Sequence, residues 1–153
     1  MEVDPWEVQL LYERNLSMEH IFMRGAEDAL SELRGLGKYR LYAATNGIER
    51  VQRRRIRESG VDAFFDGFFI SECVGANKPS SEFFERCFAE IPDFDKDEAI
   101  IIGDSLTSDI KGGINAGILT CLFNPQKKKI SGDIIPDYEI EALSEIVPLL
   151  ERL

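Results

Sequence analysis

Histidine and cysteine are scarce in this sequence of 153 residues. The single histidine, His20, would have to serve any Ser-His-Asp or Cys-His hydrolase, yet it lies in a polar stretch between two helical patterns, and we favour an exposed histidine at a helix end. The three cysteines, Cys73, Cys87 and Cys121, form no C-x-x-C pair, which argues against a disulfide framework or a zinc site. All three lie in apolar stretches, so we expect them to pack as small hydrophobic side chains. Any chemistry therefore falls to carboxylates, lysine and hydroxyl groups.

Basic residues and long apolar runs are also few. The 18 Lys and Arg residues face 28 Asp and Glu residues, for a formal net charge of −10. This balance disfavours nucleic acid and anionic membranes as partners, because both attract a basic face. No apolar run approaches the roughly 20 residues that span a bilayer, and acidic residues follow Met1 where a signal peptide would be basic. We expect one globular domain in the cytoplasm.

Short apolar runs alternate with helical patterns along the chain. The runs cover residues 41–44, 68–70, 99–102 and 118–123. Apolar runs without alternation are typical of parallel strands that are buried on both faces. Helices are predicted over residues 4–16, 26–36, 79–91 and 105–116, and over 140–150 with a kink at Pro148. In the helix over 105–116, Ile114 is expected to face inward. This alternation predicts a doubly wound α/β layer fold.

Polar residues stand where three of these runs end. They are Thr45, Asn46 and Gly47 after the first run, Lys78 before Pro79 in the loop after the second, and Gly103, Asp104, Ser105 and Asp109 after the third. Each group alone is typical of a turn or a helix cap. In an open parallel sheet, however, ligands bind beyond the carboxyl ends of the strands. Their joint occurrence therefore indicates a site.

The residue types suit transfer of a phosphoryl group with a divalent cation. The Thr45 hydroxyl and the amides that follow it can donate to phosphate oxygens, and Lys78 can neutralise phosphate charge. Asp104 and Asp109 are hard oxygen donors, and Mg²⁺ is typically held by one or two carboxylates, a phosphate and waters. Because Asp109 comes five positions after Asp104, both can face one cation only if Asp104 lies in a loop and Asp109 in the first helical turn.

These three segments, in this order, resemble motifs two, three and four of the haloacid dehalogenase (HAD) superfamily of hydrolases. The stretch 109–117, with Phe123 and Asn124 after it, resembles the branch that contains pyrimidine 5′-nucleotidases. The resemblance implies a HAD-like Rossmannoid three-layer fold with a parallel sheet. It also implies a Mg²⁺-dependent phosphoric monoester hydrolase that acts on a small phosphorylated metabolite such as a nucleoside 5′-monophosphate.

The resemblance also assigns roles to residues. It implies that Thr45, Lys78 and Asp104 are catalytic. Phosphate would be bound by Thr45, Asn46, Gly47 and Lys78. The metal ligands would be Asp104 and Asp109.

The family's first motif, D-x-D-x-T, has no counterpart before Thr45. In the family it supplies the nucleophilic aspartate at the end of a central strand. We therefore expect residues 1–24 to be a remnant of the helical cap and residues 25–153 to be the core, with the first strand and the nucleophile absent. The chain alone is then expected to be inactive, and the slot left by the strand would favour strand exchange or oligomers.

Two other interpretations come from different classes. A bacterial receiver domain also places an aspartate, a hydroxyl and Lys-Pro at strand ends, but its aspartate comes first in the chain, whereas Asp104 comes last here. A non-catalytic pseudoenzyme, or a split-enzyme subunit whose partner supplies the nucleophile strand, remains open.

Overall fold

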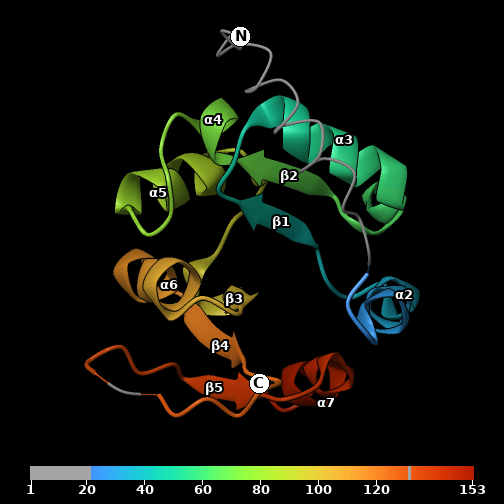
Figure 1. Ribbon diagram of the computed structural model, residues 1–153, viewed down its shortest axis with the longest axis vertical. Coiled ribbons are helices and arrows are strands. Elements are labelled where there is room, and N and C mark those ends of the chain that lie inside the picture. Colours follow the sequence, from blue (N-terminus) through green and yellow to red (C-terminus); the bar gives the residue numbers. More distant parts are fainter. Residues whose placement is uncertain (1–21, 131) are drawn as a thin grey trace, which may run out of the picture.

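The computed structural model describes residues 22–130 and 132–153 and has an α/β architecture with parallel strands (Figure 1). The strands are β1 Tyr42–Thr45, β2 Gly67–Ile70, β3 Ile100–Gly103, β4 Leu119–Phe123 and β5 Tyr138–Ile140. The helices are α2 Ala26–Leu36, α3 Glu49–Ser59, α4 Ser71–Val74, α5 Ser81–Ala89, α6 Lys111–Ala116 and α7 Ile146–Leu150. The helix predicted over 4–16, His20 and most of the predicted cap remnant lie outside the described residues.

The strands form two separate parallel sheets. In one, β1 pairs with β2, and Thr45 stands opposite Ile70. In the other, the order is β3-β4-β5, with Gly103 opposite Leu122. Within the described part of the chain, β1 and β3 each have a hydrogen-bonded neighbour on one side only. The sheet is thus divided between the strand that ends at Thr45 and the strand that ends at Gly103.

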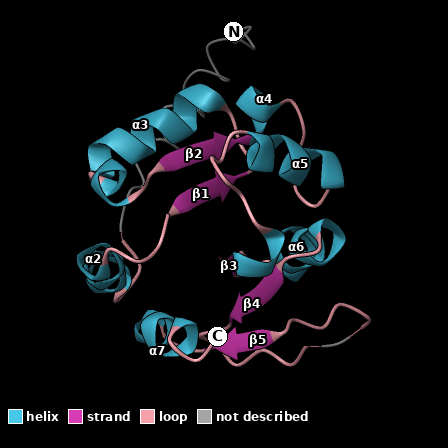
Figure 2. Ribbon diagram, turned by 180° about the vertical axis from the view of Figure 1, so that it is seen from behind, coloured by secondary structure: helices cyan, strands magenta, loops and turns pink. Residues whose placement is uncertain are grey.

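Two layers of helices hold the sheets together, as Figures 1 and 2 show. On one face, Phe83, Phe84 and Cys87 of α5 and Ala116 of α6 form a buried cluster. Residues of both sheets pack against this cluster: Ala44 of β1, Phe69 of β2 and Ile101 of β3. On the other face, α2 and α7 pack on β3, β4 and β5, together with the residues that lead into β1. The shared cluster under α5 and α6 fixes the two sheets relative to each other without direct pairing of β1 and β3.

Burial follows this division. Four of the five β4 residues are buried, whereas every residue of β1 and β3 is only half-buried. The three isoleucines of β3 are typical of a central strand, but β3 lies at the edge of its sheet and all three are only half-buried. The prediction that the apolar runs form parallel strands is confirmed, while burial on both faces holds for β4 alone.

Helix termini follow from local chemistry. The Ser80 hydroxyl caps α5 by accepting a hydrogen bond from the Phe83 amide at 3.2 Å. Gly37 ends α2 with φ of 63°, a left-handed conformation that glycine adopts without steric cost. Every helix formed by residues 22–130 and 132–153 is too short or too polar to be a membrane-spanning candidate.

Three predictions about the fold were wrong. Residues 140–150 do not form one helix: Ile140 ends β5, and α7 begins only at Ile146. Pro148 therefore lies in the first turn of α7, where its missing N–H costs no hydrogen bond and no kink is needed. Ile114 is 46% exposed, because the buried residues of the short helix α6 are Gly112, which faces Phe84 of α5, Gly113, which faces β3 and β4, and Ala116.

The third correction concerns the cysteines. Cys87 and Cys121 are buried, and burial raises the pKa of Cys87 to about 12 and that of Cys121 to about 11. Cys73 is exposed on α4, so it does not pack as a small hydrophobic residue. The buried residue of the short helix α4 is Ser71 instead.

Candidate active site

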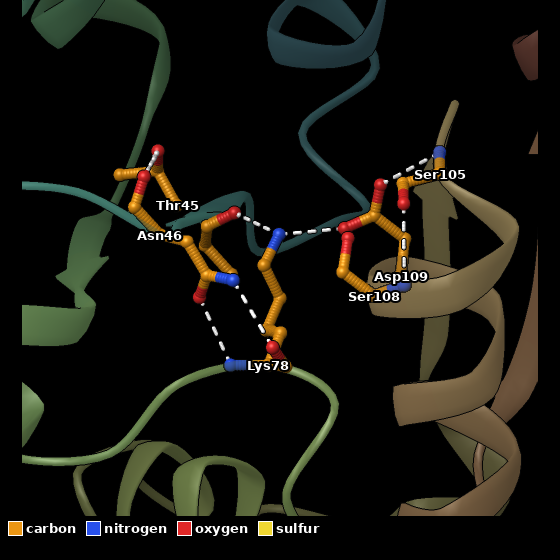
Figure 3. Close-up of polar contacts among 7 residues, drawn as sticks. Thr45, Asn46, Lys78, Ser105, Ser108 and Asp109 are labelled. Carbon is orange, nitrogen blue, oxygen red and sulfur yellow. Dashed lines mark hydrogen bonds and ion pairs between the residues drawn. The ribbon is translucent and has the colours of Figure 1, made fainter.

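Of the predicted site residues, Thr45 and Asn46 lie at the carboxyl end of β1 and Asp109 lies after β3, with Lys78 between them (Figure 3). The Lys78 ammonium donates to the Ala44 carbonyl oxygen at 2.8 Å and to Asp109 Oδ1 at 2.6 Å. Ala44 belongs to β1, and Asp109 belongs to the helical turn after β3. Lys78 thus connects the two sheets at the edge where the strands end.

The ion pair between Lys78 and Asp109 is shielded from solvent. The exposed fractions of the two side chains are 8% and 10%. The second Asp109 oxygen, Oδ2, accepts the Ser105 backbone N–H at 3.2 Å. Gly103 allows this approach, because a Cβ at position 103 would collide with the Asp109 carboxylate. Both oxygens of Asp109 are therefore held in place from within the chain.

Asp104 differs from Asp109 in its location, its exposure and its contacts. It lies in the loop between β3 and the π-helical turn Leu106–Ile110, is exposed, and forms no side-chain hydrogen bond or ion pair with the described residues. Asp109 lies within that turn, which the Ser105 hydroxyl caps by accepting the Ser108 amide at 3.2 Å. Asp104 in the loop and Asp109 in the first turn is the placement that shared coordination of one cation requires. In the described part of the chain, no three His, Cys, Asp or Glu residues group as a ligand set.

The residues after β1 take different roles. Among the described residues, the Thr45 hydroxyl makes a single, long hydrogen bond, which it donates to the Asn46 carbonyl oxygen at 3.4 Å. The Asn46 carboxamide contacts the main chain of Lys78. The Gly47 amide, a predicted phosphate donor, donates to the Ser71 hydroxyl at 2.9 Å. Thr45 therefore has the least engaged polar group of the three.

Two residues at this edge were missed from the sequence. Ser71 is 5% exposed and binds the Gly47 amide, and Glu72 Oε2 accepts the Glu49 amide at 2.5 Å. Together they satisfy amides at the start of α3, whose N-cap Ile48 has no polar side chain. Their sequence signal was their place directly after the β2 run, which is also a strand end.

A lysine, two aspartates and a threonine lie near the carboxyl ends of parallel strands, the edge at which α/β proteins with an open parallel sheet bind their ligands. The family model of haloacid dehalogenase-like hydrolases matches residues 2–117, and the chain belongs to this family. The matched range contains Thr45, Lys78 and Asp104, and the resemblance to this family that the sequence predicted is confirmed.

Relatives with sequence similarity come from several bacteria. The chain is 42% identical over 149 residues to the HAD hydrolase YfnB of Bacillus subtilis. The aligned residues cover 97% of this chain and 63% of YfnB. It is 38% identical over 141 residues to the pyrimidine 5′-nucleotidase PynA of Streptococcus pneumoniae, covering 92% of this chain and 59% of PynA. The pyrimidine 5′-nucleotidase YjjG of Escherichia coli is 34% identical over 126 residues, which cover 82% of this chain and 55% of YjjG.

The similarity extends to three dimensions. A crystal structure of YfnB bound to magnesium superposes with a TM-score of 0.90 over 98% of this chain and 65% of that one. The HAD-like α/β fold is therefore established for the described residues. The chain spans 55% to 63% of the length of these three relatives.

Proposed function

We propose that this chain carries three of the four motifs of a Mg²⁺-dependent phosphoric monoester hydrolase that acts on nucleoside 5′-monophosphates or similar small phosphates. The observation that carries the proposal is the position of the Lys78 ammonium, 2.8 Å from the Ala44 carbonyl oxygen and 2.6 Å from Asp109. A cation at the junction of two strand ends is placed to meet an anion that binds there. Two relatives, 38% and 34% identical to this chain, are pyrimidine 5′-nucleotidases, which supports the substrate class.

In this proposal, Thr45 and the amides after it bind the phosphate, and Lys78 neutralises its charge. One such charge contact is of order 4 kcal/mol at about 4 Å and an effective dielectric near 20, before desolvation. Thr45 and the Asn46 amide would act first, because the Gly47 amide must leave the Ser71 hydroxyl before it can bind phosphate.

Asp104 and Asp109 would organise Mg²⁺, which supplies charge neutralisation at the transferring phosphoryl group. Asp104 is available as a direct ligand, since its carboxylate is exposed and unengaged by the described residues. Asp109 accepts one hydrogen bond on each oxygen, which leaves lone pairs but fixes its orientation. The donor set thus fits a hard divalent cation that keeps several waters.

We further propose that the chain is an incomplete form that lacks the aspartate nucleophile and the central strand that bears it. The unpaired edges of β1 and β3, the half-burial of both strands and the share of the relatives' length that the chain spans all support this. The same features fit a split-enzyme subunit, whose partner would supply that strand.

The proposal is tested by assaying the purified chain for hydrolysis of p-nitrophenyl phosphate and nucleoside monophosphates, with and without Mg²⁺. We expect no turnover above that of the Asp104→Asn variant, because in this proposal the chain lacks the D-x-D aspartate that would accept the phosphoryl group from the substrate. Mg²⁺-dependent turnover that Asp104→Asn abolishes would show that the site is complete and would contradict the absence of a nucleophile.

Unpaired strand edges also predict self-association. Backbone N–H and C=O groups along β1 and β3 can pair with another chain, so we expect oligomers or exchanged strands. Sedimentation velocity over a range of protein concentrations should reveal species larger than 17.3 kDa. A monomer at all concentrations, with a single cooperative thermal transition, would contradict this expectation.

A further inference from the structure

The Asn46 side chain binds the main chain of Lys78 through two hydrogen bonds (Figure 3). Its Nδ2 donates to the Lys78 carbonyl oxygen at 3.0 Å, and the Lys78 amide donates to Asn46 Oδ1 at 2.9 Å. We name this pair of hydrogen bonds the Asn46–Lys78 bridge. It joins residues 32 positions apart, one after β1 and the other in the loop that leads to α5.

The bridge requires a carboxamide. Lys78 lies outside any strand, so its peptide groups have no sheet neighbour to pair with. A carboxamide carries a donor and an acceptor side by side and can satisfy both groups of one residue, as a neighbouring strand would. A carboxylate at position 46 could accept from the amide but could not donate to the carbonyl.

Lys78 is thereby held at both its main chain and its ammonium group. Its main chain is held by Asn46, and its ammonium is held by the Ala44 carbonyl and by Asp109. A lysine side chain otherwise carries about 2 kcal/mol of rotamer entropy. Anchoring the main chain beside the target limits where the ammonium can reach.

We propose that Asn46 is a positioning residue that acts through Lys78: the bridge sets the Lys78 main chain so that the ammonium lies between β1 and Asp109. The consequence for catalysis rests on the proposed function, in which Lys78 neutralises the phosphate. The Asn46 carboxamide is then engaged with the protein, and only the backbone amide of Asn46 is left for a phosphate.

The test measures Lys78 at both ends in the full chain. Backbone hydrogen exchange of the Lys78 amide reports the bridge, and the rate of Lys78 acetylation, followed by mass spectrometry, reports how well the ammonium is held. Asn46→Leu removes both hydrogen bonds at similar size. We expect it to speed exchange of the Lys78 amide and acetylation of Lys78 about two- to tenfold each, the range for one lost hydrogen bond.

Asn77 provides the matched control, since it is adjacent to Lys78, exposed, and makes no side-chain hydrogen bond with the described residues. Asn77→Leu should leave both rates at the wild-type value. Asn46→Asp keeps the acceptor and should retain protection of the Lys78 amide. Unchanged exchange of the buried β4 amides in all variants excludes global unfolding as the cause.

Wild-type acetylation of Lys78 in Asn46→Leu, or an unprotected Lys78 amide in the wild-type chain, would overturn the proposal. A parallel measurement with inorganic phosphate separates it from the proposed function. If phosphate fails to protect Lys78 from acetylation while Asn46→Leu still accelerates it, the positioning role stands and the phosphate role of Lys78 fails.

Discussion

Asp109→Asn should lower the free energy of unfolding by about 3–5 kcal/mol, the range for removing one partner of a buried ion pair. The substitution preserves volume, so it opens no cavity. Among the described residues, it leaves the ammonium of the Lys78 side chain, which is 8% exposed, with the Ala44 carbonyl and a neutral amide as its hydrogen-bond partners. Urea denaturation followed by circular dichroism would measure the change, with a lower midpoint at an unchanged slope.

Asp104→Asn is the matched control, because it makes the same chemical change five residues away on an exposed carboxylate. It should change stability by less than about 0.5 kcal/mol. Replacing both partners, with Lys78→Met and Asp109→Leu, should recover much of the loss, because no uncompensated charge remains buried. Equal losses for Asp104→Asn and Asp109→Asn would contradict the buried pair as a stabilising contact.

The sequence predicted the parts of the fold that depend on local pattern. The apolar runs at 41–44 and 118–123 correspond to β1 and β4, and glycine at position 37 ends α2 as its conformational freedom allows. The last segment was mispredicted because apolar residues recur there every three or four positions, at Ile140, Leu143, Ile146 and Leu150. This spacing fits a helical stripe, but here it spans the end of a strand, a 3-10 turn and a separate short helix.

The site was predictable in its members and less so in its contacts. Thr45, Lys78, Asp104 and Asp109 each follow an apolar run, and the rule that ligands bind at strand ends brings them together. Which carboxylate pairs with Lys78 depends on burial, which the sequence does not encode position by position. The contacts of the Asn46 carboxamide and of the Ser71 hydroxyl were not predicted, because their partners lie 32 and 24 residues away in the sequence.

Joining a strand with the D-x-D-x-T motif of the HAD family, followed by a helical cap segment, ahead of residue 1 should create Mg²⁺-dependent phosphatase activity. We expect turnover of p-nitrophenyl phosphate at least about 10³-fold above that of the chain alone, because losing a nucleophile typically costs more than this. The added strand should also pair with β1 and β3 and raise the unfolding midpoint, since it satisfies backbone groups on both edges.

Two variants of this chimera separate the strand from its chemistry. Changing both aspartates of the added D-x-D to asparagine should abolish turnover and keep the gain in stability, because the strand can still pair. Lys78→Met within the active chimera should lower turnover by about 10³-fold if the ammonium contributes about 4 kcal/mol to phosphate charge neutralisation. A chimera that gains stability but no activity would refute the assignment of Thr45, Lys78 and Asp104 as the remaining catalytic groups. A chimera that gains neither would show that β1 and β3 do not accept a strand between them.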